Sequence, residues 1–515
     1  MIRANLLRLV LVGLFVAVLP QLARAQGAAA LPAGIACESL SGGMVGELRV
    51  ADAAVVSEGR PAPACHVRGT IESTIGFEAW LPQAAWTGRY LQLGCGGLCG
   101  RIETTPQQAF GCAPAERGAF AVATSDLGHR DPSAASWGDD PERRMNFAFR
   151  ANHLTAVAAK ALIQRYYGQP AKHAYFTGCS DGGREGLMEA LRYPDDFDGI
   201  MAGAPAMNFE VLNTFHHAWT VSKNTGADGR PVLSAERLPV LHRLVLAACD
   251  TVGDGVVRDP LACRFDPLAA ICRPGADPAS CLTDAEARMA AALRDGARMA
   301  DGTRMTTGGM MWGSEANWLG TEVPAPGAAT PRALMFATGV LRYLAFWPNP
   351  PADYQVTSLA FDRPSYARIA ASQAIFDATN PDLSAYVARG GKLILWHGWA
   401  DPDISPTSTL AYWAALHQTL GDARAEGFAR LFMIPGLAHC RGGVGATTFD
   451  ALSPLLRWVE EGAAPERLEA RVPGGTLVQT LLPQGVTAPE SWIGDDRFRA
   501  AALSWCMGGV CAAAK

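Results

Sequence analysis

Residues Ala174–Ser180 read Ala-Tyr-Phe-Thr-Gly-Cys-Ser, and Asp181–Arg192 continue as Asp-Gly-Gly-Arg-Glu-Gly-Leu-Met-Glu-Ala-Leu-Arg. The first stretch is a short apolar run typical of a buried strand, and the second has apolar residues at the three- and four-residue spacing of a helix. Between them lies Gly178-Cys-Ser180-Asp-Gly182, a Gly-x-Ser-x-Gly motif whose glycines allow the strained turn that lifts a serine oxygen clear of a sheet. The strand, turn and helix together predict that Ser180 is a nucleophile.

Similar strand and helix signals lie on both sides of this segment. Short apolar runs that end in glycine or small polar residues predict strands, and apolar residues at helical spacing predict the helices between them. The predicted strands are Tyr90–Gly97, Phe120–Asp126, Ala174–Ser180, Gly199–Pro205, Lys392–His397 and Ala429–Ile434, and the predicted helices are Asn152–Gly168, Asp181–Arg192, Pro406–Leu420 and Phe449–Glu460. With the serine motif, this alternation predicts an α/β-hydrolase fold.

The two sets of strand signals are separated by a segment of different composition. Residues 206–390 are richer in Pro, Gly and Cys, contain scattered Trp, and show no clear alternation of strand and helix. We therefore predict that they form a large inserted lid domain. Residues 26–205 and 391–515 then make up the catalytic domain.

The first 25 residues have the features of a secretory signal peptide. Arg3 and Arg8 give a positive start, Leu9–Leu19 is apolar, and Ala23-Arg-Ala25 is a small-residue cleavage site. A membrane anchor needs about 18–20 apolar residues, and this run is shorter. We expect the segment to be removed, which predicts a periplasmic or secreted protein with no membrane attachment after cleavage.

Charge and cysteine content limit the classes of partner. The net charge is −5 and no basic run occurs, which argues against nucleic acid and favours small neutral or weakly charged substrates. Thirteen cysteines in an exported chain indicate disulfides, and the odd count leaves at least one thiol unpaired. Cys95-Gly-Gly-Leu-Cys99 resembles half of a zinc site, but no second pair or nearby histidines complete it.

A serine hydroxyl needs a histidine base, and in this fold the order along the chain is serine, acid, histidine. Of the ten histidines, His397, His417 and His439 follow Ser180 by enough to come after late strands. His417 falls within a predicted helix. His439 lies in a glycine-rich loop, residues 435–443, directly after a predicted strand, so it is the predicted base.

The acid is expected in the loop after the preceding strand. That loop, residues 399–403, offers Asp401 and Asp403. We predict Asp401 from its position, its order in the chain and its spacing to His439. The alternative for either aspartate is a turn residue that bonds its own backbone.

The oxyanion of acyl transfer requires two backbone N–H donors. The residue after the serine, Asp181, supplies the first. Residues Gly94–Gly100 form a glycine-rich loop after an early strand, and we predict Gly96 or Gly97 as the second donor. The alternative is that this loop is only a tight turn.

At this point the chain resembles the tannase and feruloyl esterase family, which includes the mono(2-hydroxyethyl) terephthalate hydrolases. The strongest match is Gly178–Gly186 running into Tyr193-Pro-Asp-Asp-Phe-Asp-Gly199. The family also places one cysteine directly before the nucleophile and another directly after the catalytic histidine, which matches Cys179 and Cys440. The resemblance implies an esterase that hydrolyses gallate or hydroxycinnamate esters.

The resemblance implies a set of disulfides. A Cys179–Cys440 bond would hold its Cα atoms about 4.4–6.8 Å apart and so clamp the nucleophile and the base together. The other implied pairs are Cys37–Cys65, Cys249–Cys263, Cys272–Cys281 and Cys506–Cys511. Among Cys95, Cys99 and Cys112 we expect one pair and one free thiol, with the pairing left open.

Family members with an inserted lid often bind structural calcium there, and residues 249–260 resemble that loop. The candidate ligands are Asp250, Asp254, Val256 and Asp259. About three residues carrying a carboxylate and a carbonyl are missing relative to the family pattern. The alternative to a calcium site is an Asp-Gly turn held by Cys249–Cys263.

The predicted reaction is two-step acyl transfer through an acyl-enzyme on a small aromatic ester, and it needs no organic cofactor. Aromatic side chains of the inserted segment are candidate pocket walls, and the four chosen are Trp312, Trp318, Phe346 and Trp347. Ile404 follows the acid where the specialised terephthalate enzyme carries an aromatic residue, which favours hydroxycinnamate or gallate esters. The rival activity is terephthalate monoester hydrolysis, and the rival class is a hydrolase-fold binding protein without catalysis.

Overall fold

A computed structural model describes residues 30–131, 135–370, 373–475 and 478–485, together with the backbone of 505–507 and 510–512. The predicted signal peptide, residues 1–25, lies outside these ranges. Within them, no helix is both long enough and apolar enough to cross a membrane.

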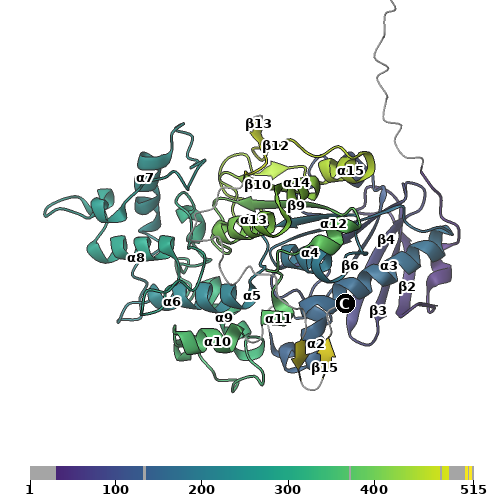
Figure 1. Ribbon diagram of the computed structural model, residues 1–515, viewed down its shortest axis with the longest axis horizontal. Helices are drawn as coiled ribbons and strands as arrows, with labels where there is room; N and C mark the ends of the chain where they lie inside the picture. The colour runs from purple at the N-terminus through teal and green to yellow at the C-terminus, as the bar shows by residue number, and fades with distance from the viewer. Residues whose placement is uncertain are drawn as a thin grey trace, which may run out of the picture.

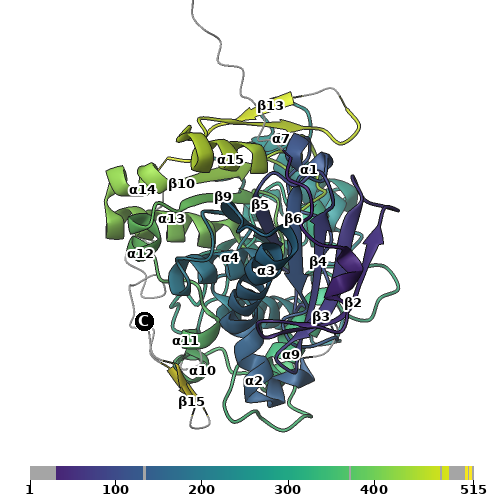
Figure 2. The ribbon, with the colours of Figure 1, turned by 90° about the vertical axis from the view of Figure 1, so that its right-hand side faces the viewer.

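The described chain is built on one sheet of ten strands in the order β1-β2-β3-β4-β6-β5-β7-β8-β9-β10 (Figures 1 and 2). Strands β5 to β10 run parallel to one another, whereas β1 to β4 pair antiparallel. The strands of the main sheet are β1 (Met44–Val45), β2 (Leu48–Val56), β3 (Ala64–Ile71), β4 (Ile75–Pro82), β5 (Arg89–Leu93), β6 (Phe120–Ser125), β7 (His173–Cys179), β8 (Gly199–Gly203), β9 (Lys392–Gly398) and β10 (Ala429–Ile434). Two small sheets contain β11 (Thr448–Phe449), β12 (Leu468–Arg471) and β13 (Val478–Leu481), and β14 (Trp505–Met507) and β15 (Val510–Ala512).

The helices divide between the two faces of the sheet and the long segment that joins β8 to β9. They are α1 (Ala113–Glu116), α2 (Pro141–Met145), α3 (Ala151–Tyr167), α4 (Asp181–Arg192), α5 (Phe209–Val211), α6 (Trp219–Lys223), α7 (Leu238–Cys249), α8 (Asp284–Asp295), α9 (Arg332–Tyr343), α10 (Arg363–Ala370), α11 (Gln373–Phe376), α12 (Ser384–Ala388), α13 (Pro406–Leu420), α14 (Asp422–Phe428) and α15 (Leu452–Glu461). A π-helical turn, η4 (Leu212–Ala218), lies between α5 and α6.

Strand residues alternate between two apolar clusters because successive side chains of a strand point to opposite faces. Phe176 belongs to the cluster that also contains residues of α3, α4 and α13. Tyr175 belongs to the cluster that contains residues of α15. Gly186 lets α4 approach the sheet, since a Cβ there would lie 3.0–3.3 Å from Ile200 and Phe176. The parallel strands are therefore covered on both sides.

All six predicted strands are present; Ala429–Ile434 has the predicted ends, and the other five differ at one end or both. The strand predicted over Tyr90–Gly97 ends at Leu93, and the glycines beyond it form a loop. The helix predicted over Phe449–Glu460 begins at Leu452, because Thr448–Phe449 pairs with β12. The antiparallel strands β1 to β4 were not predicted; β2 and β3 have mixed burial and lack the fully buried pattern of the central strands.

The segment between β8 and β9 contains α5 to α12 and contributes no strand to the main sheet. Figure 1 shows α6, α7, α8 and α10 on the side of the molecule away from β2 and β3. Apolar residues from this segment, such as Phe215 and Trp318, join the same apolar cluster as the α3 and α4 face of the sheet. The boundaries of a separate lid domain at 206 and 390 stay a prediction.

Five disulfides are present among the described side chains. Four of them are pairs that the family resemblance implied, namely Cys37–Cys65, Cys179–Cys440, Cys249–Cys263 and Cys272–Cys281. The fifth joins Cys95 to Cys99, which settles the open pairing and leaves Cys112 as a buried free thiol. The zinc alternative at Cys95 and Cys99 is wrong, because the two sulfur atoms are bonded to each other. Cys506 and Cys511 lie directly opposite each other in the backbone pairing of β14 and β15, but their side chains lie outside the described part.

Candidate active site

Ser180 lies at the sharp turn between β7 and α4. Its backbone has a positive φ of 67° with ψ −124°, a conformation that is uncommon for a residue with a side chain. The neighbouring glycines are required by close backbone contacts: a Cβ on Gly178 would lie 2.4 Å from the carbonyl oxygen of Gly182, and one on Gly183 would lie 2.3 Å from that of Gly203. The serine motif therefore forms the strained turn that its sequence predicts.

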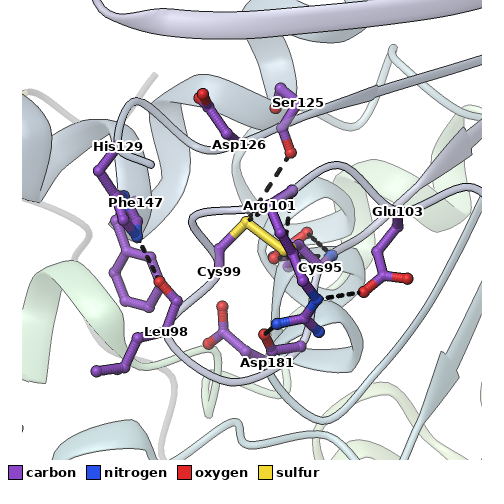
Figure 3. The surroundings of a disulfide bond; sticks show 12 residues. Cys95, Leu98, Cys99, Arg101, Glu103, Ser125, Asp126, His129, Phe147 and Asp181 are labelled. Carbon is purple, nitrogen blue, oxygen red and sulfur yellow. Dashed lines mark hydrogen bonds and ion pairs between the residues drawn. A yellow bond between two sulfur atoms is a disulfide. The ribbon is translucent and has the colours of Figure 1, made fainter. Parts of the chain in front are cut away.

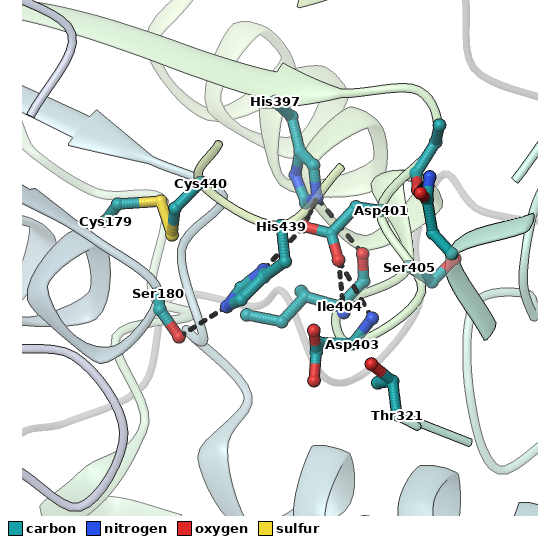
Figure 4. Close-up of polar contacts among 12 residues, drawn as sticks. Cys179, Ser180, Thr321, His397, Asp401, Asp403, Ile404, Ser405, His439 and Cys440 are labelled. Atoms are coloured by element: carbon teal, nitrogen blue, oxygen red, sulfur yellow. Dashed lines mark hydrogen bonds and ion pairs between the residues drawn. A yellow bond between two sulfur atoms is a disulfide. The ribbon is translucent and has the colours of Figure 1, made fainter. Parts of the chain in front are cut away.

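The loops after β9 and β10 bring an aspartate and a histidine to this serine (Figure 4). The Nε2 atom of His439 lies 2.8 Å from the Oγ of Ser180. Its Nδ1 atom lies 2.7 Å from the Oδ2 of Asp401. Serine, histidine and aspartate are thus connected by two hydrogen bonds of ordinary length, from segments up to 259 residues apart.

The two candidate acids have different partners. Asp401 is fully buried, and its Oδ1 accepts hydrogen bonds from the backbone amides of Asp403 and Ile404 at 2.9 and 3.0 Å. Asp403 points its carboxylate to the guanidinium of Arg332, at 2.6 and 2.7 Å. Asp401 is therefore the aspartate that is hydrogen-bonded to the histidine, while Asp403 forms an ion pair with Arg332 at the cavity.

The opposite charges of Asp401 and His439 each favour the charged form of the other residue. Burial alone acts to raise the pKa of Asp401, but the charge of His439 and hydrogen bonds from His397 and His439 outweigh it and hold the pKa below its ordinary value. Burial acts to lower the pKa of His439, but the carboxylates of Asp401 and Asp403 raise it to about 9. This arrangement therefore stabilises a positive charge on the imidazole of His439.

The Cys179–Cys440 disulfide joins the residue before the serine to the residue after the histidine. Its Cα atoms are 5.9 Å apart, and the bond spans 261 residues of sequence. Cys440 has a positive φ of 61°, and its carbonyl accepts a hydrogen bond from the side chain of Gln108 at 2.9 Å. The disulfide thus fixes the histidine loop to the serine turn.

The loop after β5, which carries the Cys95–Cys99 disulfide, lies near Asp181, the residue that follows Ser180 (Figure 3). A Cβ on Gly96 would lie 3.9 Å from the Cβ of Ser180, which places this glycine against the nucleophile. Among the described residues, no acceptor is bonded to the amides of Gly96 or Gly97. The amide of Asp181 opens α4, where helical amides have no partner within the helix. The three predicted donors therefore gather around the serine.

Several bonds hold this loop rigid. The Cys95–Cys99 disulfide closes it, and the amide of Cys95 donates to the buried carboxylate of Glu185 on α4. Arg101 donates to the carbonyl of Gly96 at 3.0 Å. Because the C=O and N–H of a trans peptide point in opposite directions, this bond turns the amide of the next residue away from Arg101.

A cavity of about 540 Å³ opens over Ser180. Ile404 lines it, as predicted, but the four proposed aromatic wall residues do not. Trp312 and Trp318 are buried elsewhere in the core, against Phe265 and Ser314 respectively. Phe346 lies under the guanidinium of Arg368, and Trp347 is 41% exposed beside Arg144. Their assignment as pocket walls is wrong.

The walls of the cavity come from other residues of the inserted segment. Phe209, Leu212 and His217 line it from α5 and η4, and Arg332 and Phe336 line it from α9. A histidine pair at 216–217 and an Arg-x-x-x-Phe spacing on one helix face were signals in the sequence that could have pointed to them. Their position within a segment of unclear periodicity hid them.

The three aspartates of the predicted calcium site are not among the groups of described residues whose ligand atoms lie within 4.8 Å of one another. Both oxygens of Asp250 accept hydrogen bonds from backbone amides of the following turn, and Asp259 caps the next turn in the same way. Asp254 forms a two-pronged ion pair with Arg258, at 2.8 and 2.5 Å. These residues do not fit the six to eight converging oxygens that calcium prefers, and they match the alternative of a turn held by a disulfide.

Comparison with known proteins gives consistent results. The family model described as tannase and feruloyl esterase matches residues 55–483. A probable feruloyl esterase B-2 of Aspergillus flavus is 31% identical over 438 residues, covering 79% of this chain and 78% of the relative. The mono(2-hydroxyethyl) terephthalate hydrolase of Piscinibacter sakaiensis is 31% identical over 519 residues, covering 84% of this chain and 85% of the relative. Among solved structures, feruloyl esterase B from Aspergillus oryzae has a TM-score of 0.76 at 27% identity, covering 87% of this chain and 95% of that structure.

Proposed function

Because this chain belongs to the tannase and feruloyl esterase family and is a carboxylic ester hydrolase, we propose that it cleaves esters of aromatic acids, with hydroxycinnamoyl or galloyl groups as the acyl part. The observation that carries the proposal is the hydrogen-bonded series Ser180, His439 and Asp401 at a cavity of about 540 Å³. A cavity of this size is within the range that holds a small ligand, and Phe209 and Phe336 offer aromatic walls to a ring.

In the first step, the Oγ of Ser180 attacks the ester carbonyl while the Nε2 of His439 takes its proton. The tetrahedral oxyanion accepts hydrogen bonds from the amide of Asp181 and from Gly96 or Gly97, and of these two Gly96 lies nearer the serine. The tetrahedral intermediate collapses, the imidazolium returns the proton to the leaving alcohol, and the acyl group stays on the serine. Water then repeats the sequence and releases the acid, so no organic cofactor takes part.

The export of the chain belongs to the same proposal. Five disulfides support a protein that matures in an oxidising compartment, such as the periplasm or the extracellular space. The N-terminal sequence, with its positive start, apolar run and Ala23-Arg-Ala25, supplies the signal. Edman or mass analysis of protein from a periplasmic fraction should give an N-terminus at Gln26.

A second candidate is hydrolysis of the terephthalate monoester. It is favoured by the similarity to the Piscinibacter sakaiensis hydrolase, and it would use the same serine, histidine and aspartate. Ile404 lines the cavity beside the acid, where a larger aromatic side chain would narrow it. We therefore place hydroxycinnamate and gallate esters first.

One screen tests the proposal. Purified protein is assayed with methyl ferulate, methyl gallate and mono(2-hydroxyethyl) terephthalate, with the Ser180→Ala variant as the matched control. We expect turnover of at least one of the first two esters, and its loss in the variant. Absence of turnover on all three, or turnover of only the terephthalate monoester, would overturn the assignment of the acyl group. A folded protein without any esterase activity would favour a binding role.

A further inference from the structure

His217 and Glu322 form a buried pair beside the proposed active site. The Nδ1 atom of His217 lies 2.7 Å from the Oε1 of Glu322, and the carboxyl of Glu322 is fully buried. His217 lines the cavity over Ser180, whereas Glu322 stands behind it. The triad does not use either residue, so their pairing needs another explanation.

The second ring nitrogen of His217 is directed away from Glu322, since Nδ1 makes the contact with that carboxyl. No residue in the described part of the chain is hydrogen-bonded to its Nε2, and this atom is not sealed off, unlike the Nε2 of the adjacent His216. The ring lies alongside that of Phe336, with centroids 6.3 Å apart and the planes inclined by 26°. A polar nitrogen therefore faces the cavity at the edge of an aromatic wall.

The surroundings of the pair decide whether this nitrogen donates or accepts. A hydrogen bond of 2.7 Å between Nδ1 and the carboxyl needs one proton between the two atoms. If the pair as a whole is neutral, a further proton is on Nε2, whether the shared proton is nearer to Glu322 or to His217. Only a net negative pair would leave Nε2 without its proton.

A net negative pair is disfavoured where it lies. Both side chains are buried, and the charges of Asp401, Asp403 and Arg332 act on both of them. His216, whose Nε2 lies 3.9 Å from the Oε1 of Glu322, also acts on Glu322, and His439 also acts on His217. Burial raises the pKa of Glu322 to about 8 and lowers the pKa of His217 to about 4. Both shifts favour the uncharged form of the group concerned, and therefore the neutral pair with a proton on Nε2.

A metal ion explains the pair less well. His216, His217 and Glu322 place one ligand atom each within 4.8 Å of the others. Tetrahedral zinc with bonds of 2.0–2.1 Å separates neighbouring ligand atoms by about 3.3 Å. The 2.7 Å contact between His217 and Glu322 is shorter than this and has the length of a hydrogen bond.

We propose that the Nε2–H of His217 donates a hydrogen bond to a hydroxy or methoxy oxygen on the aromatic ring of the bound acyl group, and that Glu322 fixes the proton on that nitrogen. The inference rests on the proposed function and narrows it to acyl groups with an oxygenated ring. Phe336, next to His217 in the same wall, supplies the apolar contact for the ring itself. An unsubstituted ring would cover the donor and leave it without an acceptor, which costs about tenfold in kcat/KM.

The experiment compares three methyl esters on the complete enzyme: ferulate, 3,4-dimethoxycinnamate and unsubstituted cinnamate. With a donor in the wall, the dimethoxy ester, which can only accept, should keep a kcat/KM within about threefold of ferulate, and cinnamate should fall about tenfold below both. A dimethoxy ester as poor as cinnamate would overturn the proposal, because it would require an acceptor in the wall. This comparison needs no variant.

Variants then locate the donor. His217→Phe should reduce the ferulate-to-cinnamate ratio of kcat/KM about tenfold, and an unchanged ratio in the folded variant would overturn the assignment. His242→Phe is the matched control: its Nδ1 lies 2.7 Å from the buried carboxyl of Glu315, but it does not line the cavity, so the ratio should stay. Glu322→Gln, which keeps an N–H facing Nδ1, should retain the ratio, whereas Glu322→Leu should lower it.

Binding to the Ser180→Ala variant separates this inference from the proposed function. Calorimetry should give a Kd for methyl ferulate about tenfold lower than for methyl cinnamate, and His217→Phe in the same background should remove that difference. Enzyme that hydrolyses aromatic esters without this preference contradicts the role of His217 alone. Enzyme that hydrolyses no aromatic ester contradicts the proposed function, whatever the binding data show.

Discussion

Asp401 and Asp403 stand two residues apart in one turn, and their partners give them different tasks. Asp401 accepts hydrogen bonds from two backbone amides and from the Nδ1 of His439, while Asp403 forms an ion pair with Arg332. The amides fix the direction of the Asp401 carboxylate, which in turn fixes the ring of His439. At the scale of single residues, the backbone of the turn therefore determines which carboxylate serves the base.

The first prediction concerns these two aspartates. Asp401→Asn should lower kcat by about 10⁴-fold, because the amide no longer selects the tautomer and charge that the base needs. Asp403→Asn should have a much smaller effect. Steady-state kinetics on the preferred ester, with circular dichroism to verify folding, measures both. A greater loss at Asp403 than at Asp401 would reverse the assignment of the acid.

The pH profile depends on the same carboxylates. His439 must be neutral to act as a base, and its pKa is raised to about 9, chiefly by Asp401 and then by Asp403, against the effect of burial. Activity should therefore rise with pH through an inflection above 6.5, the ordinary value for histidine. The contribution of the Asp401–His439 ion pair to the stability of the folded protein has the opposite dependence on pH. It is fully present below pH 6.5 and is lost as the pH rises through about 9, where His439 loses its proton.

Asp403→Asn tests this electrostatic account. The change removes one carboxylate that raises the pKa of His439 and leaves Arg332, which lowers it, without its partner. The inflection of kcat/KM against pH should therefore move to lower pH. An inflection that stays in place or moves upward would show that Asp403 does not act on the base.

At the scale of elements, two disulfides hold loops around one serine. Cys179–Cys440 joins the β7 turn to the loop after β10, and Cys95–Cys99 closes the loop that carries Gly96 and Gly97. The serine itself is held by α4, where Arg184 binds Asp181 and backbone carbonyls of the neighbouring segments. Loops carry His439, Gly96 and Gly97, while the strand β7 and the helix α4 position Ser180 and Asp181.

The Cys179→Ala, Cys440→Ala double variant tests the role of the first disulfide. Triad chemistry needs the serine oxygen about 2.6–3.2 Å from the imidazole, and a displacement near 1 Å costs about 100-fold in rate. The variant should therefore lose most of its activity at temperatures where it is still folded, as its melting curve shows. Peptide mapping without reduction should recover the two cysteine peptides joined in the native enzyme, and free thiols in fully active protein would contradict the idea.

The aspartate-rich loop after α7 is the element on which a calcium ion was expected. Its carboxylates are already bonded to amides and to Arg258, so the loop is satisfied without an ion. We now predict that a chelator leaves the melting temperature unchanged. Added calcium that raises it, together with about one bound ion per chain by metal analysis, would instead restore the expected calcium site.

At the scale of the whole molecule, the segment between β8 and β9 must stay attached to the sheet for the cavity to exist. Arg144 on α2 is fully buried and donates to the carbonyls of Leu344 and Phe346, to that of Tyr343, and to the side chain of Asn349. One guanidinium therefore satisfies several carbonyls at the end of α9, the helix that carries Arg332 and Phe336.

Arg144→Met should lower the free energy of unfolding by about 3 kcal/mol or more, because it leaves buried carbonyls without donors. Arg144→Lys has a single ammonium in place of the planar guanidinium. Its free energy of unfolding should therefore lie between those of Arg144→Met and the native protein. Denaturant unfolding measures both. Arg143→Met, on the same helix but more exposed, is the control and should change stability by less than about 0.5 kcal/mol. An equal effect of the two methionine variants would show that the attachment does not depend on Arg144.

The sequence by itself determined the features that depend on residues close together in the chain. The strand, glycine turn and helix around Ser180 follow from apolar spacing and from glycine geometry, and the glycine-rich loop of His439 follows directly after its strand. The order serine, acid, histidine then selected Asp401. The family resemblance added the disulfide partners, which no local pattern specifies.

Only the tertiary structure decided which side chains surround the cavity. Phe209 and Phe336 line it and Trp312 and Trp318 do not, although all four are aromatic residues of the segment between β8 and β9. The direction of a side chain in a segment of weak periodicity is fixed by contacts from far along the chain, as when Arg332 meets a carboxylate 71 residues away. Local propensity determines each turn, whereas packing between distant segments determines what a cavity contains.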